Sequence, residues 1–225
     1  TDFTVQVRNR LYQMGLGVAA LLAAAIGWLA TPDNLGNSAP VMLLLILGGS
    51  TLLYVAGMIL FEKDEGTLSA IIVSPLTIGE YLISKIVTLT GLATLEGTAM
   101  ILGASAIMGI GTLTTFNIPV LLLCIMTLCV SYTLVGIILV VRYESITDFL
   151  VPVLFIASVL QAPALHFTGL IESTIWYVIP STAQVLIMSA AWEPLAAWEW
   201  IYALAYSAVT IGALYVWAVR AFQTH

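Results

Sequence analysis

The residue of this chain best placed to do chemistry is Glu96, a single acid in the middle of a long apolar run. It follows Lys85 by 11 residues, which is about 16 Å of helix at 1.5 Å per residue. If the run crosses a membrane, this carboxyl lies near the middle, where a charge is costly and usually functional. It could bind a cationic group of a substrate or relay a proton. A hydrogen-bonded structural carboxyl is an equally good interpretation.

Two further polar side chains, Gln161 and His166, stand near the end of another apolar run and are candidates for the same pathway. An isolated histidine is more often a packing residue than a ligand. We expect no metal site, because no second His or Cys stands at ligand spacing from His166. Cys124 and Cys129 fit best as small apolar core residues, since they point in different directions on one helix.

The composition of the chain indicates that these residues lie in a membrane. Of 225 residues, 61% are hydrophobic and 8% are charged, whereas a soluble domain is about half apolar and about a quarter charged. A spanning helix needs roughly 20 apolar residues, so the length allows about six spans with short loops and no soluble catalytic domain. A nucleic-acid surface would need clustered basic residues. The sequence predicts an all-α membrane protein with a single transmembrane domain over residues 1–225.

The apolar runs predict six transmembrane helices and two helical segments that do not cross. An amphipathic stripe over residues 2–13 predicts a helix in the membrane surface, and residues 31–40 have the composition of a turn. Residues 175–191 are apolar but interrupted by Pro180, and we expect an outer re-entrant segment there. The predicted spans are about 14–30, 41–61, 81–108, 118–141, 149–167 and 197–219.

All the basic residues fall on one side of this arrangement. Excess Lys and Arg mark the cytoplasmic side of a membrane protein. We therefore expect a multi-pass protein of the cell membrane (inner or plasma) with both termini in the cytoplasm. The residues that carry this expectation are Arg8, Arg10, Lys63, Lys85, Arg142 and Arg220.

The loop after the second span, residues 62–85, is the main feature of the predicted cytoplasmic side. Its acidic start opposes the positive end of a helix dipole, and Pro75 disfavours helix at the residue before it. We expect a short helix over 64–75 that lies across the membrane face, followed by a new helix that begins at the capping-box spacing of Thr77 and Glu80. The apolar side of the short helix needs a surface to dock on, either the chain's own helix ends or another protein: Leu68, Ile71 and Ile72.

The motifs of this loop resemble the signature of permease subunits of type-2 ABC exporters. In that family an acidic residue, a Gly-Thr-Leu, a Ser-Pro-Leu and a Lys follow the second span, and Tyr177-Val178-Ile179-Pro180 is similar to its outer re-entrant segment. The resemblance covers nearly the whole chain. Within the family the chain is most similar to fluoroquinolone-export permeases, on Phe61-Glu62-Lys63, Glu80-Tyr81-Leu82 and His166-Phe167-Thr168-Gly169-Leu170.

The resemblance implies a transport subunit that exports a small amphipathic or drug-like substrate by alternating access. A separate soluble ATPase would bind ATP and Mg, and this chain would be no enzyme and carry no cofactor, which agrees with the absence of a Gly-Lys-Ser/Thr phosphate loop. Six spans are half of the usual unit, so a second permease subunit, identical or a sister, is implied. The residues implied to contact the ATPase are Glu62, Asp64, Glu65, Gly66, Thr67, Leu68, Ile71, Ile72, Ser74 and Pro75.

Two other classes of protein remain open on the sequence. An intramembrane enzyme would need a nucleophile, a base and an orienting group, and Glu96 alone cannot supply them. An ion-coupled secondary transporter of this size usually shows inverted repeats, and no convincing repeat relates the two halves.

Overall fold

The structure is a computed structural model that describes residues 10–31, 35–65, 77–171 and 173–224. Every regular element within these ranges is helical. Among the described residues, six helical segments are long and apolar enough to cross a membrane, as the sequence predicted. They are α2 (Leu11–Leu29), α3 (Leu35–Asp64), α5 (Ile78–Met108), α6 (Ile118–Val140), α7 (Ile146–Gln161) with its continuation α8 (Ala164–Phe167), and α10 (Ala197–Thr224).

The second span begins earlier than the sequence predicted. The turn expected over 31–40 is wrong in its second half, because α3 starts at Leu35 and contains Pro40. Leu35 and Ala39 are fully buried, so packing extends the helix across a proline that would otherwise weaken it.

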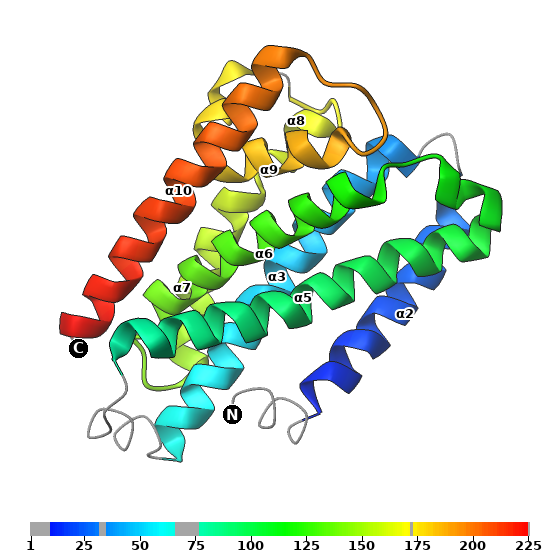
Figure 1. The fold of residues 1–225 in the computed structure, drawn as a ribbon. Coiled ribbons are helices and arrows are strands. Elements are labelled where there is room, and N and C mark those ends of the chain that lie inside the picture. The colour runs from blue at the N-terminus through cyan, green and yellow to red at the C-terminus, as the bar shows by residue number, and fades with distance from the viewer. Residues whose placement is uncertain (1–9, 32–34, 66–76, 172, 225) are drawn as a thin grey trace.

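The central helix of the bundle is α3, which contacts α5, α6 and α7, while α2 lies along α5 (Figure 1). The face that α2 turns toward α5 is made of small residues, including the buried Ala19 and Ala23. A Cβ atom added at Gly103 of α5 would stand 2.9 Å from the Cβ of Ala23, so the two backbones are in close approach. This face of α2 therefore packs against another helix of the same chain.

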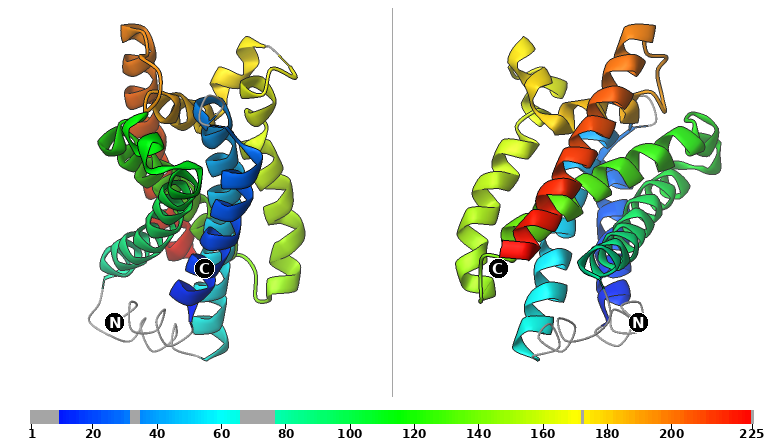
Figure 2. Two further views of the ribbon diagram at one scale, coloured as in Figure 1. Left: turned by 90° about the vertical axis from the view of Figure 1, so that its right-hand side faces the viewer. Right: turned by 60° about the vertical axis from the view of Figure 1, so that its left-hand side comes forward.

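The 175–191 stretch divides into η2 (Thr174–Val178) and α9 (Pro180–Ser189), on the same end of the bundle as α8 (Figure 2). At 10 residues, α9 is about 15 Å long, roughly half of the hydrocarbon thickness of a bilayer. It contacts α6 and α10, and its residues 181–188 are buried. These dimensions fit a segment that does not cross, while its depth in the membrane remains a prediction.

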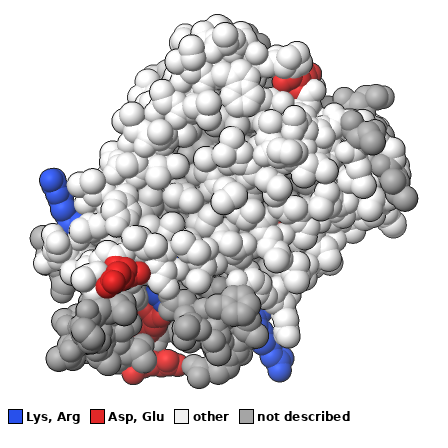
Figure 3. Space-filling model, viewed as in Figure 1, with Lys and Arg blue, Asp and Glu red and all other residues white. Residues whose placement is uncertain are grey.

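Charge is distributed unevenly along the bundle. In Figure 3 the visible Lys and Arg atoms lie along the left and lower edges, and the broad surface above them is mostly uncharged. The start of α2, the end of α3, the start of α5 and the end of α10 share this lower end (Figure 1). We call it the basic end, and its described members are Arg10, Lys63, Lys85, Arg142 and Arg220.

Candidate functional site

A buried ion pair lies at the base of the loop between α3 and α5. The Lys85 ammonium forms an ion pair with the Glu62 carboxylate, and their side chains are 0% and 11% exposed. The Tyr81 hydroxyl donates a hydrogen bond of 2.8 Å to Oε2 of Glu62, and the Lys85 Nζ atom stands 5.2 Å from the centroid of the Tyr81 ring. A buried charge is tolerated when it is paired and hydrogen-bonded. These contacts hold the end of α3 against the first two turns of α5.

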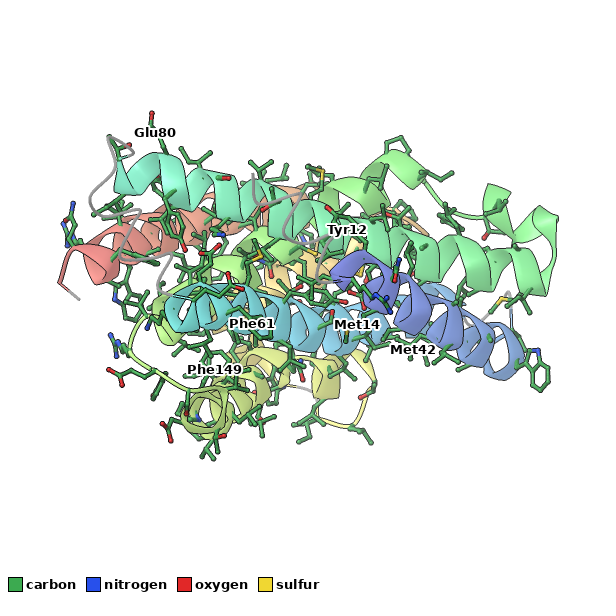
Figure 4. The ribbon with its side chains drawn as sticks, turned by 90° about the horizontal axis from the view of Figure 1, so that it is seen from below. Tyr12, Met14, Met42, Phe61, Glu80 and Phe149 are labelled. Carbon is green, nitrogen blue, oxygen red and sulfur yellow. The ribbon has the colours of Figure 1, made fainter. Side chains whose placement is uncertain are left out.

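The beginning of α5 is fixed by the capping box that the sequence predicted. The Glu80 amide donates to the Thr77 hydroxyl, and the Thr77 amide donates to Oε2 of Glu80 over 2.8 Å. This carboxylate projects away from the bundle (Figure 4). Its hydrogen bonds with the backbone amide and the hydroxyl of Thr77 lower its pKa, because both stabilise the charged form.

A second ammonium group, that of Lys63, reaches across to the end of α6. It donates hydrogen bonds to the backbone carbonyls of Val140, Val141 and Tyr143 at 3.3, 2.9 and 2.8 Å. The last carbonyls of a helix have no partner within the helix and carry the negative end of its dipole. Lys63 therefore satisfies both the hydrogen bonds and the charge of this helix end.

The structure places only part of the predicted ATPase contact. Glu65 is exposed, whereas Glu62 is turned inward into its ion pair. Asp64 is the last residue of α3. The other predicted contact residues lie outside the described residues: Gly66, Thr67, Leu68, Ile71, Ile72, Ser74 and Pro75.

The sequence reasoning missed the structural partners at this base. Lys63 served only as a motif residue and as one of the basic residues that mark the cytoplasmic side, Tyr81 served only as a motif residue, and Glu62 was assigned to the ATPase contact. One signal was present: two opposite charges, Glu62 and Lys85, stand at the two ends of one loop in a chain that has very few charges. Such residues are expected to pair when the loop ends meet at an apolar surface.

The intramembrane carboxyl, Glu96, is fully buried. Its Oε2 atom accepts a hydrogen bond of 3.0 Å from the Ser50 hydroxyl, and the Tyr54 side chain interacts with the same carboxyl. Both partners belong to α3. Among the described residues, Oε1 of Glu96 has no hydrogen-bond partner. The side chain thus faces the interior of the bundle and keeps one oxygen available to a proton, a water molecule or a cationic group.

The other two candidate pathway residues lie elsewhere. The Gln161 side chain donates a hydrogen bond of 3.1 Å to the Leu45 carbonyl. The His166 ring packs edge-on against Phe167 and Tyr177, with centroids 5.4 and 6.1 Å away. These contacts involve the end of α7, α8 and η2, and, through Leu45, the helix α3 that also binds Glu96. They share no residue with the contacts of Glu96. The structure therefore describes two separate polar positions.

Two hollows could accept a small molecule. A groove of about 820 Å³ between α2, α5 and α6 is lined almost entirely by apolar atoms, with Thr90 and Thr94 in its wall. A more polar hollow of about 610 Å³ lies between the start of α3 and residues 167–169. Pockets for drug-sized ligands have volumes in this range. Within the described residues, no group of three His, Cys, Asp or Glu side chains could hold a metal ion.

Comparison with known proteins gives one consistent match. The fluoroquinolones export permease protein family matches residues 1–225. Two curated relatives, from Mycobacterium tuberculosis strains CDC 1551 / Oshkosh and H37Rv, are both described as fluoroquinolones export permease proteins. Each is 29% identical over 221 residues, which is 95% of this chain and 88% of the relative. The chain belongs to the fluoroquinolones export permease protein family.

Proposed function

We propose that the chain is the transmembrane permease subunit of an ATP-driven ABC exporter. It moves a small amphipathic or drug-like substrate out of the cell by alternating access, and a separate soluble subunit binds ATP and Mg and hydrolyses the nucleotide. The observation that carries the proposal is the ion pair between the two helices that flank residues 66–76 in the sequence. Glu62 and Lys85 join the two long helices that flank this segment, so a push on it would move both helices together.

The permease works beside a second permease subunit, identical or a sister, and in contact with membrane lipid. Apolar surfaces on two of the spans support this assignment. On α7, Val151 and Phe155 are 75% and 69% exposed. On α10, Ile201 and Val209 are both 69% exposed. An exposed apolar surface of this kind is expected against lipid or against another membrane helix.

In this proposal the basic end faces the cytoplasm, and substrate passes from it toward the end that carries α8 and α9. Glu96 interacts with a cationic group of the substrate or with a proton, and Gln161 and His166 act near the exit. The free Oε1 atom of Glu96 supports the first role. The hollow of about 610 Å³ beside Phe167, the residue that follows His166, supports a role of His166 near the exit.

The test is to purify the tagged chain from its native membrane and identify the proteins that accompany it. The chain and the associated ATPase are then reconstituted in proteoliposomes, and accumulation of a fluorescent fluoroquinolone is followed with ATP. We expect accumulation that requires ATP and is lost when the ATPase carries an inactivating substitution in its phosphate loop. Accumulation by the purified chain alone, driven by a proton gradient, would instead establish an ion-coupled carrier.

A further inference from the structure

The Lys63 ammonium uses all of its hydrogen-bond donors in its contact with the turn after α6. A lysine ammonium has three hydrogen-bond donors. All three are engaged, with the carbonyls of Val140, Val141 and Tyr143 at 3.3, 2.9 and 2.8 Å. These carbonyls belong to the end of α6 and to the turn that leads into α7. The neighbouring Glu144 carboxylate adds an electrostatic interaction with the same ammonium.

The adjacent residue of α3 makes a different connection. Glu62 pairs with Lys85 of α5. Two consecutive side chains at the end of α3 therefore bind two different helices, α5 and the end of α6.

The turn after α6 is in turn connected to α7. The Tyr143 ring packs edge-on against Phe149, with the centroids 6.2 Å apart, and Phe149 is fully buried. A displacement of this turn is therefore transmitted to the first turns of α7 by direct contact.

We infer that Lys63 is a positioning residue, whose ammonium fastens the turn between α6 and α7 to the end of α3 so that the two move as one unit. Displacement of α3 at the basic end then reaches α7 through this contact. The source of the displacement rests on the proposed function, in which an ATPase acts on the permease. The fastening itself does not depend on that proposal.

Three variants separate this role from general stability. Lys63→Met keeps the length of the side chain and removes its donors, Lys63→Arg keeps the charge and the donors, and Arg142→Gln removes an exposed basic side chain from the same turn. In the reconstituted complex, we expect Lys63→Met to lower transport and substrate-stimulated ATP hydrolysis by about tenfold, within the usual range of coupling between sites. ATPase recruitment and basal hydrolysis stay at wild-type levels. Lys63→Arg restores most of the lost coupling, and Arg142→Gln has no effect.

A distance measurement tests the fastening without any ATPase. Spin labels are attached at Glu65→Cys and Thr147→Cys, both exposed positions, in a chain whose two buried cysteines are replaced by alanine. In lipid nanodiscs the wild-type background should give one narrow distance distribution, and Lys63→Met a broad or shifted one. The same distribution in both would overturn the inference.

Failure of the proposed function and failure of the positioning role of Lys63 give different results. If the chain recruits no ATPase, the proposed function fails, and the spin-label distances still decide whether Lys63 holds the turn. If Lys63→Met reduces recruitment, basal hydrolysis and transport in parallel, the residue supports only the general structure of the cytoplasmic end, and the positioning role is wrong.

Discussion

The hydroxyl of Ser50 on α3 lies 3.0 Å from Oε2 of Glu96 on α5 and donates a hydrogen bond to it. This contact joins two spans, and the carboxyl is fully buried within the chain. A buried polar group without a partner is costly, and the second carboxyl oxygen has none among the described residues. The pair therefore combines a structural contact with an oxygen that has no hydrogen-bond partner among the described residues.

Substitution Glu96→Gln should separate these two roles. The amide can still accept the Ser50 hydrogen bond, so the yield and thermal stability of the purified permease should stay close to wild type. Loss of the carboxyl should lower transport of cationic substrates by about tenfold, the equivalent of one interaction of about 1.4 kcal/mol, and leave neutral substrates unaffected. Transport assays with a matched cationic and neutral pair measure the difference. Unchanged transport of both would leave only the structural role.

The buried ion pair at the loop base predicts a non-additive double-mutant cycle. Lys85→Met leaves the Glu62 carboxylate buried without its cation and should lower the free energy of unfolding by about 3–5 kcal/mol. Glu62→Met should have a comparable effect. The double variant should recover most of the loss, because it removes both charges together. Thermal unfolding of the four proteins in detergent gives the coupling, and simple addition of the two single losses would argue against the pair.

Close contact between α3 and α6 depends on the glycine at position 48. A Cβ atom placed there would come within 2.6 Å of a Tyr132 ring carbon. Gly48→Ala should therefore cost about 1–3 kcal/mol by overpacking. Gly17→Ala is the matched control, because a Cβ on that glycine of α2 meets nothing within 4 Å, and it should be neutral or slightly stabilising by helix propensity. Equal melting temperatures for the two variants would contradict the packing.

The sequence was sufficient for the number of spans, because each apolar run is long enough to cross a bilayer and polar turns separate the runs. It was also sufficient for the start of α5, since the side chains of Thr77 and Glu80 satisfy local backbone groups. It was insufficient at Pro40, where the burial of Leu35 and Ala39 outweighs the tendency of proline to interrupt a helix. Local rules describe neighbours along the chain, and the start of α3 is decided by tertiary packing.

In the candidate site, too, the sequence predicted some features, and others depend on tertiary contacts. Glu96 was identified as an interior carboxyl because a lone charge in an apolar run has few other places to lie. Its contact with Ser50 joins residues 46 positions apart, and the contact of Lys63 with Tyr143 joins residues 80 apart. No spacing rule connects positions so distant, so these partners could come only from the structure.

The orientation of the bundle can be tested by labelling single cysteines in intact cells. The proposed topology places Arg220 in the cytoplasm and Trp198, at the other end of α10, outside. A membrane-impermeant maleimide should label Trp198→Cys in whole cells and label Arg220→Cys only after the membrane is opened. The native Cys124 and Cys129 are fully buried and give a low background. Labelling of position 220 from outside would show that the proposed topology is wrong.

The segment between α3 and α5 lies outside the described residues, and we expect its apolar side to dock on the ATPase. If Leu68 docks on the ATPase, its burial contributes roughly 1.5–3 kcal/mol to the contact. Leu68→Asp should then weaken recruitment about ten- to a hundredfold, as each 1.4 kcal/mol is a factor of about ten. Leu68→Met, which keeps an apolar side chain, should bind almost normally. Both variants should fold, since the buried base at Glu62 and Lys85 is intact. Binding of the ATPase to nanodisc-embedded permease measures the effect. Wild-type affinity of the Leu68→Asp variant would show that Leu68 does not contact the ATPase.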